Sequence, residues 1–145
     1  DKARSVALDK FKILSHIPKV KLFSLQKGEA SKQMNNLQVI NLADDITDFA
    51  DTSAIIENLD LVISVDTAAA HLAGAMGKPV WLLLPYVPDW RWGLDNQVTG
   101  WYPSMKLFRQ EKLGEWDSVF QEISEELENF KKSKKGENFN YLSLK

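Results

Sequence analysis

Two predominantly apolar runs, joined by a helix of small residues, constrain the fold of this chain more than any other feature. The first run, Leu59–Val65 (LDLVISV), is β-branched and apolar on both faces, which is typical of a central strand in a parallel sheet. Thr67–Met76 (TAAAHLAGAM) predicts a helix that ends at Gly77, and Pro79–Leu84 (PVWLLL) predicts a second buried strand. Two such strands and their connecting helix predict a parallel sheet with a crossover helix.

Strand-like and helix-like periods also alternate through the rest of the chain, and their order predicts the fold class. The sequence favours helices at Val6–Ile17, Asp48–Asn58 and Glu115–Phe130, a short helix after a turn at Gly28, and strands at Val20–Leu25, Gln38–Leu42 and Lys106–Phe108. This order predicts an α/β fold, a Rossmann-like doubly wound parallel sheet. Such a domain usually begins with a strand, whereas this sequence opens on a helix. We therefore expect the domain to lack its first strand and to belong to a larger protein.

Charge divides the chain near residue 130. The predicted helix Glu115–Phe130 carries six acidic and no basic residues, whereas residues 131–145 carry five lysines and one glutamate. This asymmetry predicts a domain over residues 1–130 and a basic, flexible tail over residues 131–145. A partner-binding tail is the alternative interpretation of the same lysines.

Composition excludes several classes of protein. The 18 Lys and Arg residues against 20 Asp and Glu give a net charge of −2, which offers no concentrated basic surface for nucleic acid. With no cysteine and only His16 and His71, the chain lacks disulfides and the usual ligands of a metal site. No apolar run approaches the ~20 residues of a membrane span, and the N-terminus lacks the apolar core of a signal peptide. We expect a cytoplasmic protein without a metal site.

The sequence around Asp66, Thr67 and His71 is the strongest candidate for a binding site. Thr67 stands where the helix N-cap is expected, at the carboxyl end of a buried strand, where open α/β sheets bind ligands. Backbone N–H groups of Thr67, Ala68 and Ala69 would offer a phosphate site at the helix start. Asp66 could accept hydrogen bonds from sugar hydroxyls, and His71 lies one turn further along the same helix face. A simple helix cap and a core histidine would explain the same residues.

The run ISVDTAAAHLAGAMGKPVWLLLP resembles the nucleotide-sugar-binding half of family nine glycosyltransferases, the ADP-heptose:lipopolysaccharide heptosyltransferase family. RSVALDKF, FSLQKGE, DFADTSAIIENLDLVISVDT and LLPYVPDWRW…WYPSMKLFRQ are similar to the version fused behind tetratricopeptide (TPR) repeats in bacterial proteins. The resemblance covers about residues 3–125. It departs from the family at Ala68, where heptosyltransferases often have glycine, and an alanine there has no special freedom for positive φ.

The resemblance implies a GT-B glycosyltransferase with two Rossmann-like domains facing a cleft, of which this chain is the C-terminal half. That half holds the donor, a nucleotide-diphospho-sugar, without a metal or other cofactor. The missing N-terminal domain supplies the acceptor site and the catalytic base, so we expect no catalytic residue in this chain and no transferase activity from it alone. The residues expected to bind the donor diphosphate and sugar are Asp66, Thr67, Ala68, His71 and Lys27.

Loops at the ends of two other strands supply weaker candidates. Gln26 and Lys27 lie in the turn after the strand Val20–Leu25, where the resemblance implies that Lys27 contacts the leaving diphosphate and Gln26 shapes the loop. A surface lysine in a turn is the alternative. Asp44 follows the strand Gln38–Leu42 and could bind ribose hydroxyls, although an acidic helix cap explains it equally well. The ends of these strands are expected to line one edge of the sheet with Asp66.

Residues 85–104, here called the aromatic loop, form a long connection with five aromatic side chains. Long loops in compact domains are usually functional. Trp90 could stack on a nucleobase or sugar, and Arg91 could contact a phosphate. Packing of the rings against one another, as a rigid lid, is the expectation for the remaining aromatic residues.

Three functional hypotheses remain on the sequence alone. The leading one is the donor-binding half of a metal-independent GT-B glycosyltransferase that transfers a sugar to a glycan or protein acceptor. The alternative is a non-catalytic interaction or scaffold module of a TPR-repeat protein. A flavodoxin-type nucleotide-binding protein is disfavoured because no glycine-rich phosphate loop follows an early strand.

Overall fold

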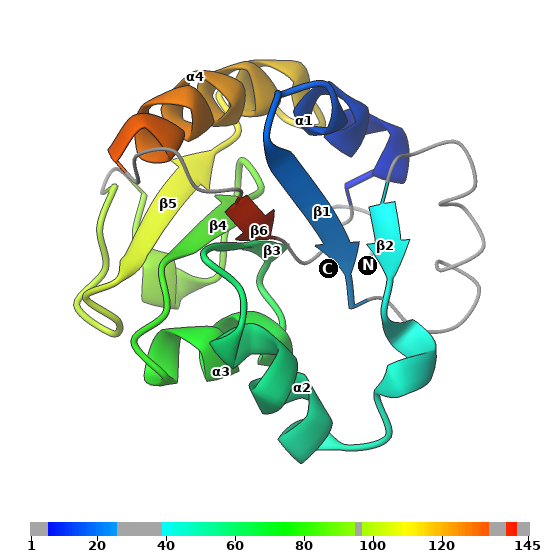
Figure 1. Ribbon diagram of the computed structural model, residues 1–145. Helices are drawn as coiled ribbons and strands as arrows, with labels where there is room; N and C mark the ends of the chain where they lie inside the picture. The colour runs from blue at the N-terminus through cyan, green and yellow to red at the C-terminus, as the bar shows by residue number, and fades with distance from the viewer. Residues whose placement is uncertain (1–5, 26–38, 95–96, 134–138, 142–145) are drawn as a thin grey trace.

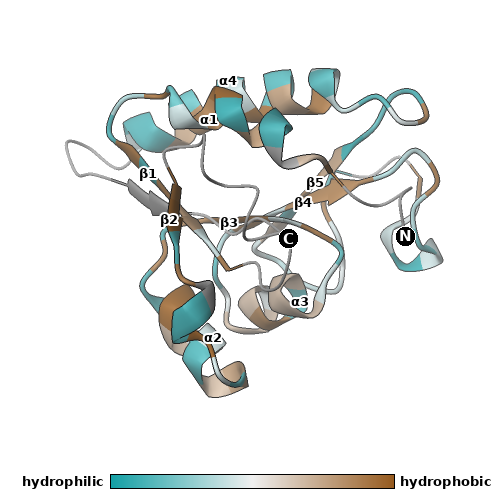
Figure 2. Ribbon diagram, turned by 90° about the vertical axis from the view of Figure 1, so that its right-hand side faces the viewer, coloured by the Kyte–Doolittle hydropathy of each residue, from teal (hydrophilic) through white to brown (hydrophobic). Residues whose placement is uncertain are grey.

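The helices lie in two layers on either side of the strands. The computed structural model describes residues 6–25, 39–94, 97–133 and 139–141. Helices α1 and α4 cover one side, and α2 and α3 cover the other (Figure 1). Figure 2 shows the same layers after a quarter turn, with β4 and β5 between them mostly in the hydrophobic colour. This arrangement confirms the predicted α/β class with helices on both faces of a parallel sheet.

The strands pair in two ladders of three, and every pairing between them is parallel. One ladder has the order β2 (Val39–Asn41), β1 (Val20–Ser24), β6 (Phe139–Tyr141). The other has the order β3 (Val62–Val65), β4 (Val80–Leu84), β5 (Met105–Arg109). Within each ladder the carboxyl ends of the strands therefore point the same way.

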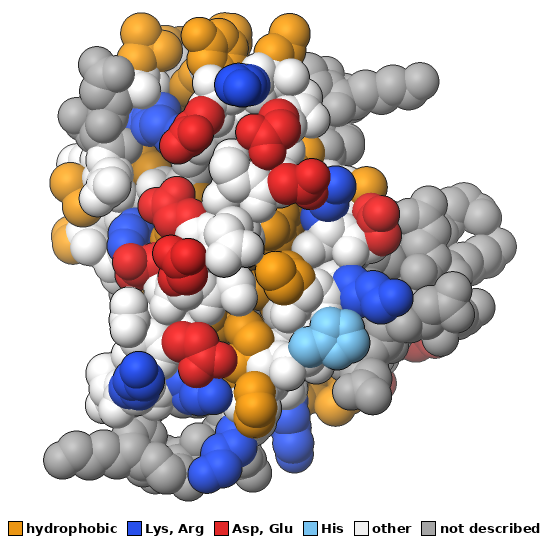
Figure 3. Space-filling model, turned by 90° about the horizontal axis from the view of Figure 1, so that it is seen from above, with side chains coloured by type: hydrophobic (Ala, Val, Ile, Leu, Met, Phe, Trp, Pro, Cys, Tyr) orange, Lys and Arg blue, Asp and Glu red, His pale blue; other side chains and the backbone are white. Residues whose placement is uncertain are grey.

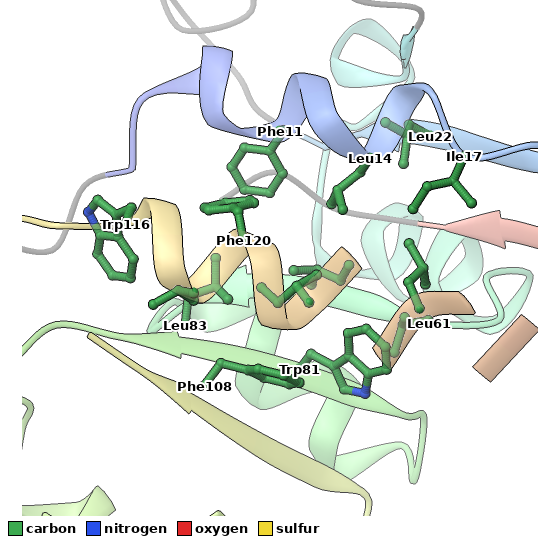
Figure 4. Packing of buried hydrophobic residues seen from close by; sticks show 14 residues of the cluster. Phe11, Leu14, Ile17, Leu22, Leu61, Trp81, Leu83, Phe108, Trp116 and Phe120 are labelled. Atoms are coloured by element: carbon green, nitrogen blue, oxygen red, sulfur yellow. The ribbon is translucent and has the colours of Figure 1, made fainter. Parts of the chain in front are cut away.

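Strand β4 is apolar at every position because both of its faces are covered. Trp81 and Leu83 pack into the cluster beneath α1 and α4, of which Figure 4 shows the side chains. Val80, Leu82 and Leu84 pack into the cluster on the side of α2 and α3. Because successive side chains of a strand alternate between faces, a strand covered by helices on both sides needs apolar residues at every position.

Helices α2 (Phe49–Glu57) and α3 (Ala68–Ala75) begin and end close to where the sequence predicts. The Asp48 side chain caps α2 by accepting a hydrogen bond from the backbone N–H of Asp51. Thr67 caps α3 in the same way, and Met76 is its C-cap. The predicted helix Val6–Ile17 is instead a 3₁₀ turn at Leu8–Phe11 followed by α1 (Lys12–Ser15).

Helix α4 (Asp117–Ser133) separates an apolar inner face from an acidic outer face. Val119, Phe120, Ile123 and Leu127 are buried against the sheet. Figure 3, which views this layer from above, shows acidic side chains interspersed with Lys and Arg. Such amphipathicity is what holds a surface helix to a core. Among the residues that the structure describes, no helix is long and apolar enough to cross a membrane.

The structure describes only part of the segment 131–145, for which the sequence predicts a flexible tail. Helix α4 continues through Lys131, whose Nζ lies 3.0 Å from the carbonyl oxygen of Pro18 and 3.3 Å from Glu128 Oε2. Phe139–Tyr141 form β6, which pairs with β1. Aromatic residue types favour strands, and β6 pairs with backbone groups of β1 that would otherwise lie at the edge of the ladder. The division of the chain into domains stays a prediction.

Candidate functional site

The site begins where β3 ends and α3 starts. Thr67 has extended dihedral angles (φ −142°, ψ 167°), and its Oγ1 accepts a hydrogen bond of 3.3 Å from the N–H of Ala70. The hydroxyl of Ser64, on strand β3, lies 3.1 Å from the same Oγ1 and holds it in place. First-turn amides of a helix have no acceptor inside the helix, so this junction directs N–H groups toward the carboxyl edge of the sheet.

Asp66 and His71 form a close pair across this first turn. His71 Nε2 lies 2.9 Å from Asp66 Oδ1. The Asp66 side chain is 10% exposed and the His71 side chain 28% exposed. The structure therefore brings these two predicted site residues into direct contact with each other.

Two side chains from the aromatic loop complete the cluster. Trp92 Nε1 donates to Asp66 Oδ2 over 3.0 Å, and Tyr102 Oη lies 3.0 Å from His71 Nδ1. The His71 ring lies 5.6 Å, centroid to centroid, from each of the Trp92 and Tyr102 rings. In a neutral imidazole whose Nε2 donates to a carboxylate, Nδ1 accepts from the tyrosine hydroxyl. Sequence reasoning missed both loop residues, because packing within the loop was the expectation for them.

The signal that could have located Tyr102 is Gly74. This glycine leaves room for the Tyr102 ring. A Cβ atom on Gly74 would lie 2.8 Å from Tyr102 Cγ, which is closer than real Cβ contacts. A glycine inside an otherwise alanine-rich helix therefore marks the place where the aromatic loop crosses α3.

Replacing Gly74 with alanine is expected to lower the free energy of unfolding by about 1–2 kcal/mol. Overpacking against the Tyr102 ring costs ~1–3 kcal/mol, of which the better helix propensity of alanine offsets up to about 1 kcal/mol. Urea denaturation would measure the change. The control is Gly100→Ala, because a Cβ atom there meets nothing within 4 Å. Equal stability of the two variants would contradict the packing described here.

The backbone of the aromatic loop is anchored separately from the cluster. Its 3₁₀ turn, Trp90–Trp92, is capped by Asp89 and followed by Gly93 at a φ of 64°. The Arg109 guanidinium donates to the carbonyl oxygens of Gly93, over 2.9 Å, and of Trp92. Because β5 fixes Arg109, the loop is held to the sheet as well as to α3.

Trp90 and Arg91 lie at the outer surface of this turn. Trp90 is 82% exposed. The Arg91 side chain donates to both carboxylate oxygens of Asp89, over 3.2 and 3.4 Å. The hydrogen bond and charge of the Asp89 carboxylate raise the pKa of Arg91. Trp90 thus presents its ring to solvent, whereas the Arg91 guanidinium is engaged by Asp89.

The remaining predicted site residues are placed as follows. Ala68 is the exposed first residue of α3 and has no positive φ, so the alanine is accommodated without strain. Asp44 is exposed in a 3₁₀ turn after β2. Gln26 and Lys27 lie outside the described residues, so their expected place at the sheet edge stays a prediction. Within the described part of the chain, no group of three His, Asp or Glu side chains could hold a metal ion.

Comparison with known proteins identifies the family to which this chain belongs. The family model for glycosyltransferase family 9 (heptosyltransferase) matches residues 18–99, which is more than half of the chain and runs from β1 past the Trp92 turn. The chain belongs to glycosyltransferase family 9. The Asp66–Thr67 junction, His71 and Trp92 all fall inside the matched segment of this family 9 chain, while Tyr102 lies just beyond it.

One curated relative extends the likeness toward the C-terminal end. Protein FlbA of Caulobacter vibrioides is 30% identical over 126 residues, which cover 79% of this chain and 20% of FlbA. The family 9 chain thus spans about one fifth of the length of that relative. No solved structure gave a significant match.

Proposed function

We propose that this family 9 domain binds the nucleotide-diphospho-sugar donor of a GT-B glycosyltransferase. The observation that carries the proposal is the family match over a segment that contains a capped helix start at the carboxyl end of a parallel strand. Ligands of open α/β sheets bind at such ends, and helix starts favour phosphate groups. Membership of the family supports glycosyl transfer as the reaction of the intact protein.

The donor diphosphate would lie on the N–H groups at the start of α3. Thr67 and Ala68 provide the amides. His71 lies further along α3 and supports the first turn through its contact with Asp66. Lys27 is proposed as a cationic contact to the leaving diphosphate, where positive charge stabilises the bond-breaking step. Trp90 offers an exposed aromatic face for the nucleobase, with Arg91 beside it.

The rest of the machinery is proposed to lie elsewhere in the intact protein. The catalytic base and the acceptor site belong to an N-terminal Rossmann-like domain, so the 145-residue chain alone is inactive. TPR repeats preceding this C-terminal half and a cytoplasmic, bacterial setting are part of the same proposal. The small share of FlbA that the chain covers is consistent with a domain of a longer protein. Donor binding proceeds without a metal, because helix-start amides and basic side chains offset the diphosphate charge.

A nucleotide titration tests the proposal. In buffer containing a metal chelator, ADP, UDP or GDP should shift the amide NMR signals of Thr67–Ala70, with a Kd of about 1 mM because half of the cleft is absent. Lys27→Ala should weaken this binding several-fold, since a charge-assisted contact to phosphate is lost. Asp45→Asn, a change at an exposed 3₁₀ turn, is the control and should leave binding unchanged. An absence of shifts at several millimolar nucleotide would refute donor binding by this domain.

A further inference from the structure

We propose that Asp66 is a positioning residue that holds the aromatic loop onto α3, and that it does not bind the hydroxyls of the donor sugar. This inference rests on the proposed function for its consequence, since it concerns how the same site recognises a donor. Its structural basis, however, is independent of any ligand. It assigns Trp92, rather than a sugar, as the partner of the Asp66 carboxylate.

Both oxygens of the Asp66 carboxylate already have protein donors. Oδ1 lies 2.9 Å from His71 Nε2, and Oδ2 accepts from Trp92 Nε1 over 3.0 Å. A carboxylate can accept further hydrogen bonds only where a donor can approach its remaining lone pairs. With the side chain 10% exposed, little of it is open to a ligand. A sugar hydroxyl could reach Asp66 only after Trp92 or His71 moved.

Trp92 is not free to move. Its side chain is 2% exposed and packs in the apolar cluster between the sheet and α2–α3. Its carbonyl oxygen accepts a hydrogen bond from Arg109, which extends from β5. Displacing the indole would therefore expose a large apolar surface and break the anchor of the loop as well.

His71 connects Asp66 to the other end of the aromatic loop, at Tyr102. Its Nδ1 is the partner of the Tyr102 hydroxyl, and the Tyr102 ring fills the space above Gly74. Asp66 thus fixes Trp92 directly and Tyr102 through the imidazole. Trp90, two residues before the first anchor, stays exposed at the surface, so recognition of a donor relies on the helix start and on that exposed ring.

The first arm of the test needs no ligand. In Asp66→Asn, the amide cannot accept from both donors in the way that the carboxylate does. The Trp92 indole N–H signal in ¹H–¹⁵N NMR spectra should shift, together with the backbone amides of Gly93 and Tyr102. Trp92→Phe, which removes the indole donor but keeps an apolar ring, should reproduce the shifts of the Gly93 and Tyr102 amides. Asp45→Asn serves as the control without an effect. An unchanged indole signal in Asp66→Asn overturns the proposal.

The second arm compares each nucleoside diphosphate with its sugar ester, using ADP and ADP-glucose, UDP and UDP-glucose, and GDP and GDP-mannose. If Asp66 only positions the loop, Asp66→Asn weakens the binding of the nucleoside diphosphate and of its sugar ester by the same factor. That factor is on the order of tenfold, for one lost charged hydrogen bond. Adding Trp92→Phe to Asp66→Asn should then weaken binding by less than Trp92→Phe does alone. A loss confined to the sugar ester would show that Asp66 contacts the sugar and would overturn the proposal.

The two arms separate this inference from the proposed function. If no nucleotide binds the unmodified protein, donor binding fails as a function, while the indole signal still decides whether Asp66 positions the loop. If nucleotides bind but the Trp92 indole signal is unchanged in Asp66→Asn, the proposed function stands and the positioning role of Asp66 fails.

Discussion

Replacing Phe108 with alanine is expected to lower the free energy of unfolding by about 3–5 kcal/mol. Phe108 is 1% exposed and lies on β5 beneath α4. Its ring centroid is 5.2 Å from that of Trp81, and Lys106 Nζ lies 5.2 Å above the ring. Alanine would leave a cavity in the larger of the two clusters and remove the aromatic and cation–π contacts together.

The matched control is the same substitution at Phe49, whose side chain is 65% exposed at the start of α2. Phe49→Ala should change stability by no more than about 0.5 kcal/mol, because little apolar surface is lost from the interior. Urea denaturation followed by circular dichroism measures both variants. A Phe108→Ala midpoint as high as that of Phe49→Ala would mean that β5 does not lie beneath α4 as described.

Local periodicity was enough to predict the central layer of the fold. The strand β4 and the helix α3 lie within one or two residues of their predicted bounds. These elements are specified by short-range information, namely a fully apolar strand, a threonine cap and a following Gly77 at a φ of 74°. The end of the chain was harder, because β6 depends on the edge of β1, more than a hundred residues away.

The candidate site was predicted in part for the same reason. Thr67, Asp66 and His71 are neighbours along the chain, so strand and helix geometry alone brings them together. Trp92 and Tyr102 are 26 and 31 residues away from their partners, and no local pattern indicates which loop aromatic points inward. The exposed Trp90 and the buried Trp92 are indistinguishable by residue type. Only tertiary packing decides between them.

That contrast supplies the sharpest test of the site's architecture. Trp92→Ala is expected to lower the free energy of unfolding by about 3–5 kcal/mol, because a 2% exposed indole leaves both a cavity and an Asp66 oxygen without its donor. Trp90→Ala, two residues away and 82% exposed, is expected to stay within about 0.5 kcal/mol of the unmodified protein.

Nucleotide binding should rank the two tryptophans differently from stability. If Trp90 stacks on a base, its removal costs about 1–3 kcal/mol of binding, which is at least several-fold in Kd, in a protein that remains as stable as before. Trp92→Ala should weaken binding only together with its loss of stability, since the indole reaches a ligand solely by way of Asp66 and the loop. Urea denaturation and nucleotide titration on the same three proteins measure both properties. If Trp90→Ala binds nucleotide normally, the exposed ring has no part in recognising the donor, and the helix start must carry the affinity alone.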